Sequence, residues 1–274
     1  MFENILENVN TKTPLVHSIT NYVTVNDCAN IILACGGSPI MADDSSEVED
    51  ITSICNSLVL NIGTLNERTI ASMLKAGKKA NELSHPVALD PVGAGASALR
   101  TNTVFKLLDK VKFSVIRGNI SEIKTVYQGS GTTKGVDADI NDAVNETNIE
   151  EAVAFAKKLS QKTGAVIAIT GAIDLVADSQ KAYIIRNGNA LMSKITGTGC
   201  MLTTVIAAYC GANPENLLDA TAAAVCAMGL CGELAYQRLQ AINGGTSTYR
   251  GFIIDEMSKM NAKTLNGGMK VESR

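Results

Sequence analysis

Apolar runs alternate with longer amphipathic stretches through the first two thirds of the chain. The runs hold five or six residues rich in valine, isoleucine and leucine, which predicts buried strands. The expected strands cover residues 15–19, 58–63, 86–90, 113–117 and 165–170. The stretches between them carry apolar residues at helical spacing, and they predict helices at about 1–10, 25–34, 46–54, 66–83, 97–110 and from 120 onward.

Strands that alternate with helices of this length form βαβ units on a parallel sheet. The run at 165–170 is apolar on both faces, as a central parallel strand is. Residues 174–178 and 182–186 flank a short polar turn and predict an antiparallel hairpin at the sheet edge. The last third of the chain predicts helices at about 200–210, 215–238 and 247–261, the last capped by Thr246 or Ser247.

Polar segments separate these elements. Residues 38–44 are predicted to form a loop that supplies caps for the next helix, and 129–148 predict either a linker or a flap over a site. No change in composition and no internal repeat marks a domain boundary. We therefore expect one α/β domain over residues 1–274. It should be a three-layer α/β/α sandwich with a mostly parallel central sheet and a loose tail at 265–274.

Charge and composition exclude several classes of partner. The chain has 274 residues, a net charge of −3 and no basic run, so neither nucleic acid nor an anionic membrane is expected to bind. No apolar run reaches the roughly 18 residues of a membrane span, and the apolar segment at 220–230 predicts a buried helix. The N-terminus lacks a signal-peptide pattern, and the seven scattered cysteines form no Cys-x-x-Cys pair. These features predict a cytoplasmic protein without disulfides or a zinc site.

A glycine-rich turn at 196–200 leads into the helical pattern that follows it. Gly197 and Gly199 allow a sharp turn, and the free N–H groups of the next helix favour a phosphate there. Cys200 lies at the same positive helix end, which favours its thiolate. The turn therefore predicts a phosphoryl-transfer site, with a flexible loop beside a buried cysteine as the alternative.

Asn119-x-x-Glu122 opens the helix that follows the strand at 113–117. One interpretation is a helix cap with its partner glutamate. The other is that Glu122 holds a magnesium-bound water near nucleotide phosphates, because magnesium prefers carboxylates and water. Helix N-termini at the carboxyl edge of a parallel sheet are where ligands bind, which supports the second interpretation in part.

The segment 90–98 imitates a dinucleotide-binding fingerprint, with Gly93 and Gly95 between a strand and a helix. An acidic residue is usual at the end of the next strand, but that strand ends in Arg117, which leaves only an NADP-type interpretation. Asp90 as a strand-end carboxylate near a site is the more useful interpretation. Arg117 and Thr170, both at strand ends, are candidates to contact phosphate or simply end their strands.

Other catalytic templates are missing from the sequence. There is no P-loop, no His-Glu-x-x-His motif, no nucleophile elbow and no protein-kinase motif set. The two histidines, His17 and His85, are too few for a histidine metal site. A partly buried imidazole with satisfied hydrogen bonds is the favoured interpretation of His17.

Taken together, these segments resemble the hydroxyethylthiazole kinases of the ribokinase-like superfamily. The similarity runs in order over about 250 residues, and its first and last blocks are specific to these kinases. The matching blocks are 14–24, 38–42, 89–95, 117–122, 170–171 and 196–200. The resemblance implies phosphorylation of the primary alcohol of 4-methyl-5-(2-hydroxyethyl)thiazole by ATP with Mg²⁺, a salvage step toward thiamine, in a homotrimer with sites between subunits.

The resemblance also implies roles for individual residues. Asn21, Met41 and Gly197 would bind the thiazole substrate, while Arg117, Thr170 and Gly199 would bind ATP. Asp90 and Glu122 would arrange the magnesium ion and its waters. Cys200 stands where related sugar kinases have an aspartate base, which puts the strength of general-base catalysis in doubt.

Two other functions remain open on the sequence. An NADP-dependent oxidoreductase would use the Gly93 turn together with Arg117. A non-catalytic thiazole-binding module would keep the fold and lose the phosphate site, although every expected residue of that site is present.

Overall fold

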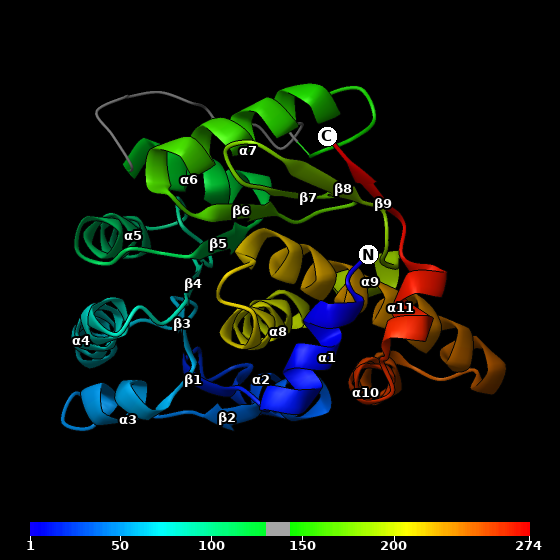
Figure 1. Ribbon diagram of the computed structural model, residues 1–274, viewed down its shortest axis with the longest axis horizontal. Helices are drawn as coiled ribbons and strands as arrows, with labels where there is room; N and C mark the ends of the chain where they lie inside the picture. The colour runs from blue at the N-terminus through cyan, green and yellow to red at the C-terminus, as the bar shows by residue number, and fades with distance from the viewer. Residues whose placement is uncertain (130–142) are drawn as a thin grey trace.

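The computed structural model of the protein describes residues 1–129 and 143–274, and a single mixed sheet runs through this part of the chain (Figure 1). Its strand order is β2-β1-β3-β4-β5-β6-β7-β8-β9. Strands β1 to β6 run parallel, and β7, β8 and β9 are each antiparallel to the strand before them in this order. The strands are β1 (Leu15–Ile19), β2 (Ser38–Ile40), β3 (Ser57–Asn61), β4 (Val87–Asp90), β5 (Val115–Gly118), β6 (Val166–Ile169), β7 (Asp174–Ala177), β8 (Ala182–Ile185) and β9 (Val271–Ser273).

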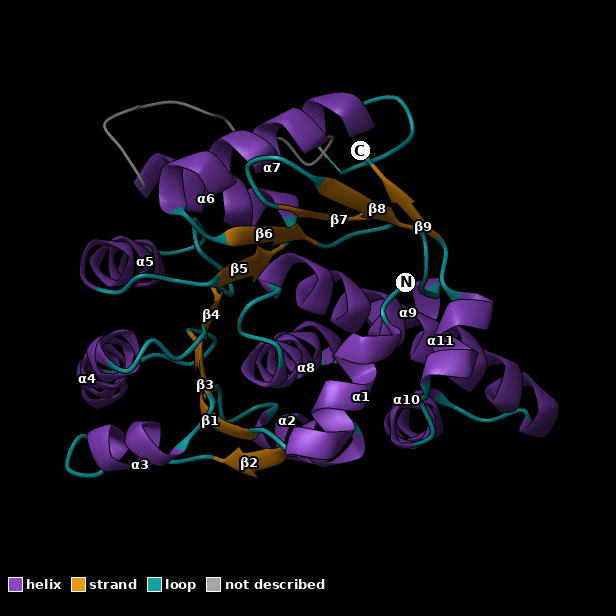
Figure 2. Cartoon of the chain, in the orientation of Figure 1, coloured by secondary structure: helices purple, strands orange, loops and turns teal. Residues whose placement is uncertain are grey.

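Helices cover both faces of this sheet, which confirms the predicted three-layer α/β architecture (Figure 2). One face carries α3 (Val48–Ile54), α4 (Glu67–Glu82), α5 (Ala98–Lys110), α6 (Ile120–Gly129) and α7 (Ile149–Thr163). The other carries α1 (Glu3–Lys12), α2 (Val25–Ala34), α8 (Thr198–Ala212), α9 (Leu217–Ile242), α10 (Thr246–Ser258) and α11 (Ala262–Gly268). A 3₁₀ helix at Ala190–Lys194 precedes α8.

The two faces of the central strands differ in side-chain size. Val59, Ala88 and Val115 belong to the core cluster beneath α8, whereas Leu60 and Leu89 belong to the cluster on the opposite face. Side chains alternate along a strand. The polar residues that end these strands, two positions after the small residues, therefore project toward α8.

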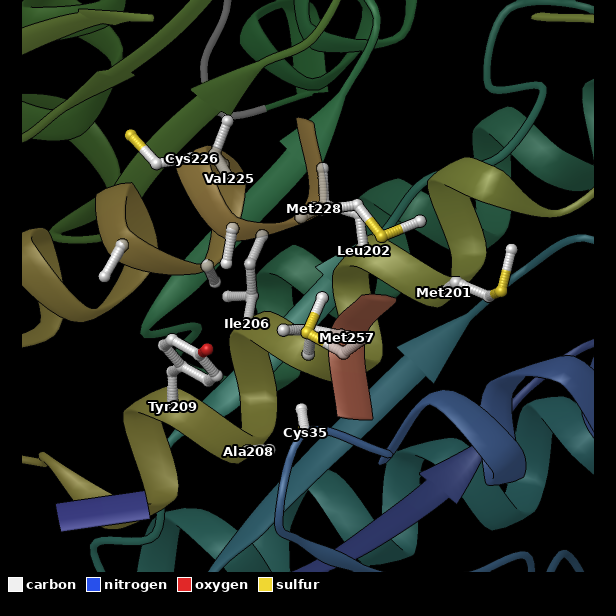
Figure 3. Packing of buried hydrophobic residues seen from close by; sticks show 14 of the residues in the cluster. Cys35, Met201, Leu202, Ile206, Ala208, Tyr209, Val225, Cys226, Met228 and Met257 are labelled. Atoms are coloured by element: carbon white, nitrogen blue, oxygen red, sulfur yellow. The ribbon is translucent and has the colours of Figure 1, made fainter. Parts of the chain in front are cut away.

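Helix α8 fills the centre of one layer. Every residue from Met201 to Cys210 is buried, and Ile206 and Tyr209 pack among side chains from neighbouring elements (Figure 3). Helix α9 is long and apolar enough to cross a membrane by composition, but 78% of its most apolar window is buried inside the fold. This confirms that the apolar segment at 220–230 is a core helix.

The hydrophobic pattern locates most elements within a few residues of their observed bounds. Helix α7 was not predicted, although its buried residues lie on one side of an amphipathic helix. The loop expected at 38–44 was wrong at its start, because Ser38–Ile40 pairs with β1 as strand β2. A three-residue strand is too short to show a periodicity.

The end of the chain also corrects the prediction. The tail expected to be loose forms α11 and then β9, which pairs with β8, so the β7–β8 hairpin does not lie at the sheet edge. Helix α10 begins after Gly245 and has no side-chain cap from Thr246 or Ser247. Most of the predicted polar segment, residues 130–142, lies outside the described residues.

Candidate functional site

The carboxyl ends of the parallel strands collect most of the predicted site residues at one edge of the sheet. Asn21 follows β1, Asp90 ends β4, Arg117 lies in β5 and Thr170 follows β6. The N-terminus of α8, with Gly199 and Cys200, approaches the same edge. In open α/β sheets, this edge is where ligands bind.

Asp90 is the most deeply buried charged group of this cluster, with no exposed surface. Its Oδ2 accepts hydrogen bonds from Asn61 Nδ2 at 2.8 Å and Thr203 Oγ1 at 2.9 Å. Arg117 Nη1 lies 3.7 Å from Asp90 Oδ1, which has no hydrogen-bond partner among the described residues. Burial raises the pKa of Asp90 to about 6, because desolvation outweighs the opposing effect of Arg117.

Arg117 connects this carboxylate to the opposite side of the site. Its Nη2 donates to Thr170 Oγ1 at 2.6 Å, so the two predicted phosphate contacts lie side by side. A Cβ atom added at Gly199 would collide with the guanidinium group. Glycine at this position therefore allows α8 to begin directly against Arg117.

Cys200 lies in the first turn of α8 and is only partly exposed. Asn21 Nδ2 donates to its Sγ at 3.2 Å. Burial, and after it the nearby Asp90, raises the pKa of the thiol, although side chains of Thr24, Asn61 and Asn21 act in the opposite direction. The expectation that the helix end favours the thiolate is therefore wrong for this structure, because desolvation dominates.

Glu122 forms the capping box that its spacing predicts. Glu122 N–H donates to Asn119 Oδ1 at 2.9 Å, and Asn119 N–H donates to Glu122 Oε2 at 2.8 Å. Its Oε1 also accepts from Gly93 N–H at 2.8 Å, which ties α6 to the turn after β4. The structural interpretation of Glu122 is thus confirmed, and its role toward a metal stays a prediction.

The glycine turn after β4 is not shaped as a dinucleotide cradle. Gly93 N–H is bound by Glu122, and Gly95 N–H donates to Thr101 Oγ1 at 3.0 Å. Arg100 fills the turn by donating to backbone carbonyls, including that of Val92 at 2.6 Å. The N–H groups that would hold a pyrophosphate are therefore already used within the protein.

Gly197 lies against Thr24, which precedes α2, and Met41 follows the edge strand β2. Gly197 is the N-terminal cap residue of α8 at φ +91°, and a Cβ there would lie 2.6 Å from Thr24 Cγ2, so both conformation and space require glycine. Met41 directly follows the edge strand β2 and packs, partly buried, against the core that contains α8. Neither residue has a hydrogen bond to the Asp90 cluster.

A cavity of about 560 Å³ opens beside Arg117 and Thr170. Its other walls come from the turn after β6, the 3₁₀ helix, and the faces of α8 and α9, where Leu202 and Met228 supply apolar surface. Asp174 faces the cavity and accepts from Gly171 N–H at 2.8 Å. Burial raises the pKa of Asp174 to about 7, against the effects of that hydrogen bond and of Arg117. The volume suits a ligand of nucleotide size.

Four polar residues of this region were missed by the sequence reasoning: Thr24, Asn61, Asp174 and Thr203. Asn61 lies at the carboxyl end of β3, which is the signal that identified Asp90, whereas Asp174 begins the antiparallel strand β7 and lacks this signal. Thr24 and Thr203 carry no such signal, because a threonine in a helix or turn is common and only packing brings it to the site.

Comparison with known proteins identifies the fold and the family of the chain. The fold is that of the ribokinase-like proteins: one from Enterococcus faecalis V583 has a TM-score of 0.61 at 11% identity, covering 93% of this chain and 88% of that one. The chain belongs to the hydroxyethylthiazole kinase family, whose sequence profile matches residues 6–263.

Two relatives show how similar the chain is to hydroxyethylthiazole kinases. The hydroxyethylthiazole kinase of Clostridium acetobutylicum is 63% identical over 273 residues, which cover all of both chains. The solved structure of the hydroxyethylthiazole kinase protein from Pyrococcus horikoshii OT3 has a TM-score of 0.87 at 32% identity and covers 99% of this chain and 98% of that one.

His17 fixes the backbone next to Met41. Its Nε2 donates to the carbonyl of Ala42 at 2.9 Å, and the Thr52 hydroxyl lies 2.9 Å from Nδ1, so the imidazole has the predicted partners and is fully, not partly, buried. Burial lowers the pKa of His17, although the bond to Ala42 opposes this. In the unfolded chain the His17 imidazole therefore binds a proton as the pH falls below about 6.5, whereas in the folded chain it binds the proton only at lower pH.

We predict that this histidine makes stability depend on pH. The free energy of unfolding of the natural protein should fall relative to that of His17→Gln as the pH drops from 7.5 to 5, by at most about 1.4 kcal/mol per pH unit. Above pH 7.5 the difference should be constant, which provides the internal control. Urea denaturation measures both proteins, and a difference independent of pH from 5 to 7.5 would contradict the prediction.

Proposed function

We propose that this protein transfers the γ-phosphoryl group of ATP to the primary alcohol of 4-methyl-5-(2-hydroxyethyl)thiazole, a step of thiamine salvage. The observation that carries the proposal is the 63% identity over all of both chains to a hydroxyethylthiazole kinase. The cluster of Asp90, Arg117, Thr170 and Cys200 at the N-terminus of α8 supports it. Phosphoryl transfer to an alcohol needs alignment and charge neutralisation more than covalent help.

Arg117, Thr170 and Gly199 are proposed to bind ATP along the wall of the cavity. The guanidinium group supplies a fixed positive charge, and the Thr170 hydroxyl can turn toward a phosphate oxygen. The free N–H groups of the first turn of α8 point toward the same region and favour negative charge there. Because these groups are held in place before substrate binds, they can stabilise the charge that develops during transfer.

The residues around Asp90 fit a magnesium ion held mainly by water and phosphate. Within the described chain no three acidic, histidine or cysteine side chains converge as a metal cage, and Mg²⁺ commonly uses only one or two carboxylates. Asp90 Oδ1 is buried without a hydrogen-bond partner among residues 1–129 and 143–274, and Glu122 lies close enough to raise the pKa of Asp90. Asp90 and Glu122 would hold the ion, which when bound neutralises phosphate charge.

Asn21, Met41 and Gly197 are proposed to bind the thiazole, with Cys200 accepting the proton of its alcohol. Asn21 already contacts Cys200, which supports a substrate alcohol placed beside the sulfur. The raised pKa of Cys200 leaves little thiolate at neutral pH, and bound phosphates would raise it further. Cys200 should therefore contribute near the lower, roughly hundredfold end of general-base catalysis.

We place this activity in a reducing, cytoplasmic compartment. All seven cysteines are free thiols, and six of them are buried within the fold. Disulfides would be expected to form among suitably placed thiols in an oxidising compartment. Fractionation of cells that produce the protein would reveal a different location.

Release of ADP from MgATP should depend on hydroxyethylthiazole. A coupled assay with millimolar alcohol is expected to show turnover that stops when either the alcohol or Mg²⁺ is omitted. Folded protein that binds the alcohol but releases no ADP would favour the non-catalytic binding module. Enhanced nicotinamide fluorescence in a titration with NADPH would favour the oxidoreductase.

Substitution of Cys200 separates a base from a packing residue. Cys200→Ala is expected to lower kcat about hundredfold and to leave the KM for ATP nearly unchanged, because backbone N–H groups bind the phosphates. Cys200→Asp should retain or exceed the natural rate, because a carboxyl group is more ionised at neutral pH than a thiol whose pKa burial raises in the same place. The same assay would contradict a base at this position if the folded Asp variant were no faster than the Ala variant.

We also propose that three copies assemble with the thiazole sites between subunits. Two large apolar side chains directly after Asn21 support this, since Tyr22 and Val23 are 79% and 59% exposed beside the site. Light scattering is expected to give three times the mass of the chain, and Tyr22→Asp should shift the protein toward smaller species with loss of turnover. An active monomer would overturn the proposal.

A further inference from the structure

Asn61 connects polar side chains of the site to one another, although it is too deeply buried to bind substrate itself. It is the last residue of β3, is 1% exposed, and is the register partner of Asp90 on β4. It projects toward α8, as Asp90 does, because it lies two positions after Val59. A buried amide in this position must find partners for its oxygen and its nitrogen.

The orientation of the Asn61 amide is fixed by its neighbours. Its Oδ1 accepts from Gly63 N–H at 2.9 Å, and a backbone N–H can only donate. Nδ2 therefore faces Asp90 Oδ2 at 2.8 Å, where a donor is required. A hydrogen bond to a buried carboxylate is stronger than one between neutral groups.

The same reasoning orients Asn21. Its Oδ1 accepts from Thr24 N–H at 3.1 Å and from Thr24 Oγ1 at 3.0 Å. The two protons on its Nδ2 are then directed to Asn61 Oδ1 at 3.1 Å and to Cys200 Sγ at 3.2 Å. The sulfur is thus an acceptor in this bond.

Gly63 leaves the space that Asn21 occupies. A Cβ atom at Gly63 would lie 2.8 Å from Asn21 Cβ and 3.0 Å from Asn21 Nδ2. Its backbone conformation is not in the left-handed region, so only this contact opposes a larger residue. The Asn21 side chain is therefore held between the Gly63 backbone and the Asn61 amide.

We propose that Asn61 is a positioning residue that links the Asp90 carboxylate to Cys200 through the amide of Asn21. This inference rests on the kinase function proposed above. Without the Asn61 oxygen, Asn21 Nδ2 loses its oxygen acceptor, and the amide is held by Thr24 at Oδ1 and by Cys200 alone at Nδ2. Cys200 then loses a donor that stabilises its thiolate, and Asp90 loses one of its two hydrogen-bonded side chains.

Charged and titratable groups around Cys200 come from three other elements. Cys28 from α2 and Asp90 from β4 lie close enough to interact with it electrostatically, and Arg117 from β5 lies against Gly199. Asn61→Ala leaves these groups in place but also removes a donor to Asp90 and the effect of the Asn61 amide on the pKa of Cys200. Gly63→Ala, which displaces Asn21 and keeps Asn61, therefore isolates the part of the link that runs through Asn21.

Two measurements on Asn61→Ala test the proposal. In the ADP-release assay, kcat should fall about 10- to 100-fold while the KM for ATP stays within about threefold, because Arg117, Thr170 and the N-terminus of α8 remain in place. In the second measurement, iodoacetamide alkylates Cys200 over a range of pH and mass spectrometry quantifies the labelled peptide. The midpoint of this profile should rise by about one unit, since a hydrogen bond to the charged form is lost.

Two further variants keep the test independent of folding. Gly63→Ala displaces Asn21 and leaves the Asn61–Asp90 pair in place, and it should raise the alkylation midpoint and lower kcat in the same direction. Asn66→Ala is the matched control: it removes the α4 cap, where Asn66 Oδ1 accepts from Thr69 N–H, and lies outside the amide link. It should be less stable, with kcat and the midpoint unchanged.

Each outcome decides between the proposals. If the alkylation midpoint rises in Asn61→Ala and Gly63→Ala but not in Asn66→Ala, the result supports the link. This holds even if the natural protein releases no ADP, because that separate result would overturn the kinase function alone. An unchanged midpoint and kcat in both folded variants overturn the link and leave the kinase function standing. If Asn61→Ala does not fold, the midpoint of Gly63→Ala alone decides.

Discussion

The burial of one carboxylate determines how the rest of the site is arranged. Asp90 is removed from water at the end of a central strand, and a charge in that position is costly unless polar groups surround it. Asn61 and Thr203 donate to it, and Arg117 balances its charge from the next strand. Even with these partners, burial raises the pKa of Asp90 to about 6. These partners therefore cannot move independently of Asp90.

The charged groups of the site are oriented when the protein folds, so the reaction does not have to supply the free energy for orienting them. The guanidinium of Arg117 is already directed by Thr170 and Asp90 before any nucleotide binds. Groups held in this way need little reorganisation when charge develops on a substrate. The small side chains beneath α8, such as Ala88, make this possible because they let the start of the helix approach the strand ends.

The sequence predicts the layers better than it predicts the site. Five- and six-residue apolar runs locate the central strands because burial on both faces leaves a readable pattern, whereas β2 and β9 hold three residues each and leave none. Asp90 and Arg117 could be predicted as strand-end residues. Asn61 occupies an equivalent position, but an asparagine there is equally typical of a turn, and only the register with β4 shows that it faces Asp90.

Interactions between elements that are far apart in the sequence could not be predicted from the sequence. The helix end beside Cys200 suggested a thiolate, but burial and the approach of Asp90 from another strand raise the pKa of the thiol. The capping box of Glu122 followed from spacing alone, since both partners lie in one helical turn. Its third bond, to Gly93 on a different strand–helix connection, has no signature in the sequence.

The two outer strands of the sheet restrict how copies of this chain can associate. Strand β2 is three residues long and contains Pro39, which has no N–H to donate to a further strand. Strand β9 is equally short, and Glu272 within it pairs with Arg186 and Arg274. Short edges with proline or charge discourage strand addition and aggregation. A continuous intermolecular sheet is therefore disfavoured at both ends, and assembly should use helices and loops.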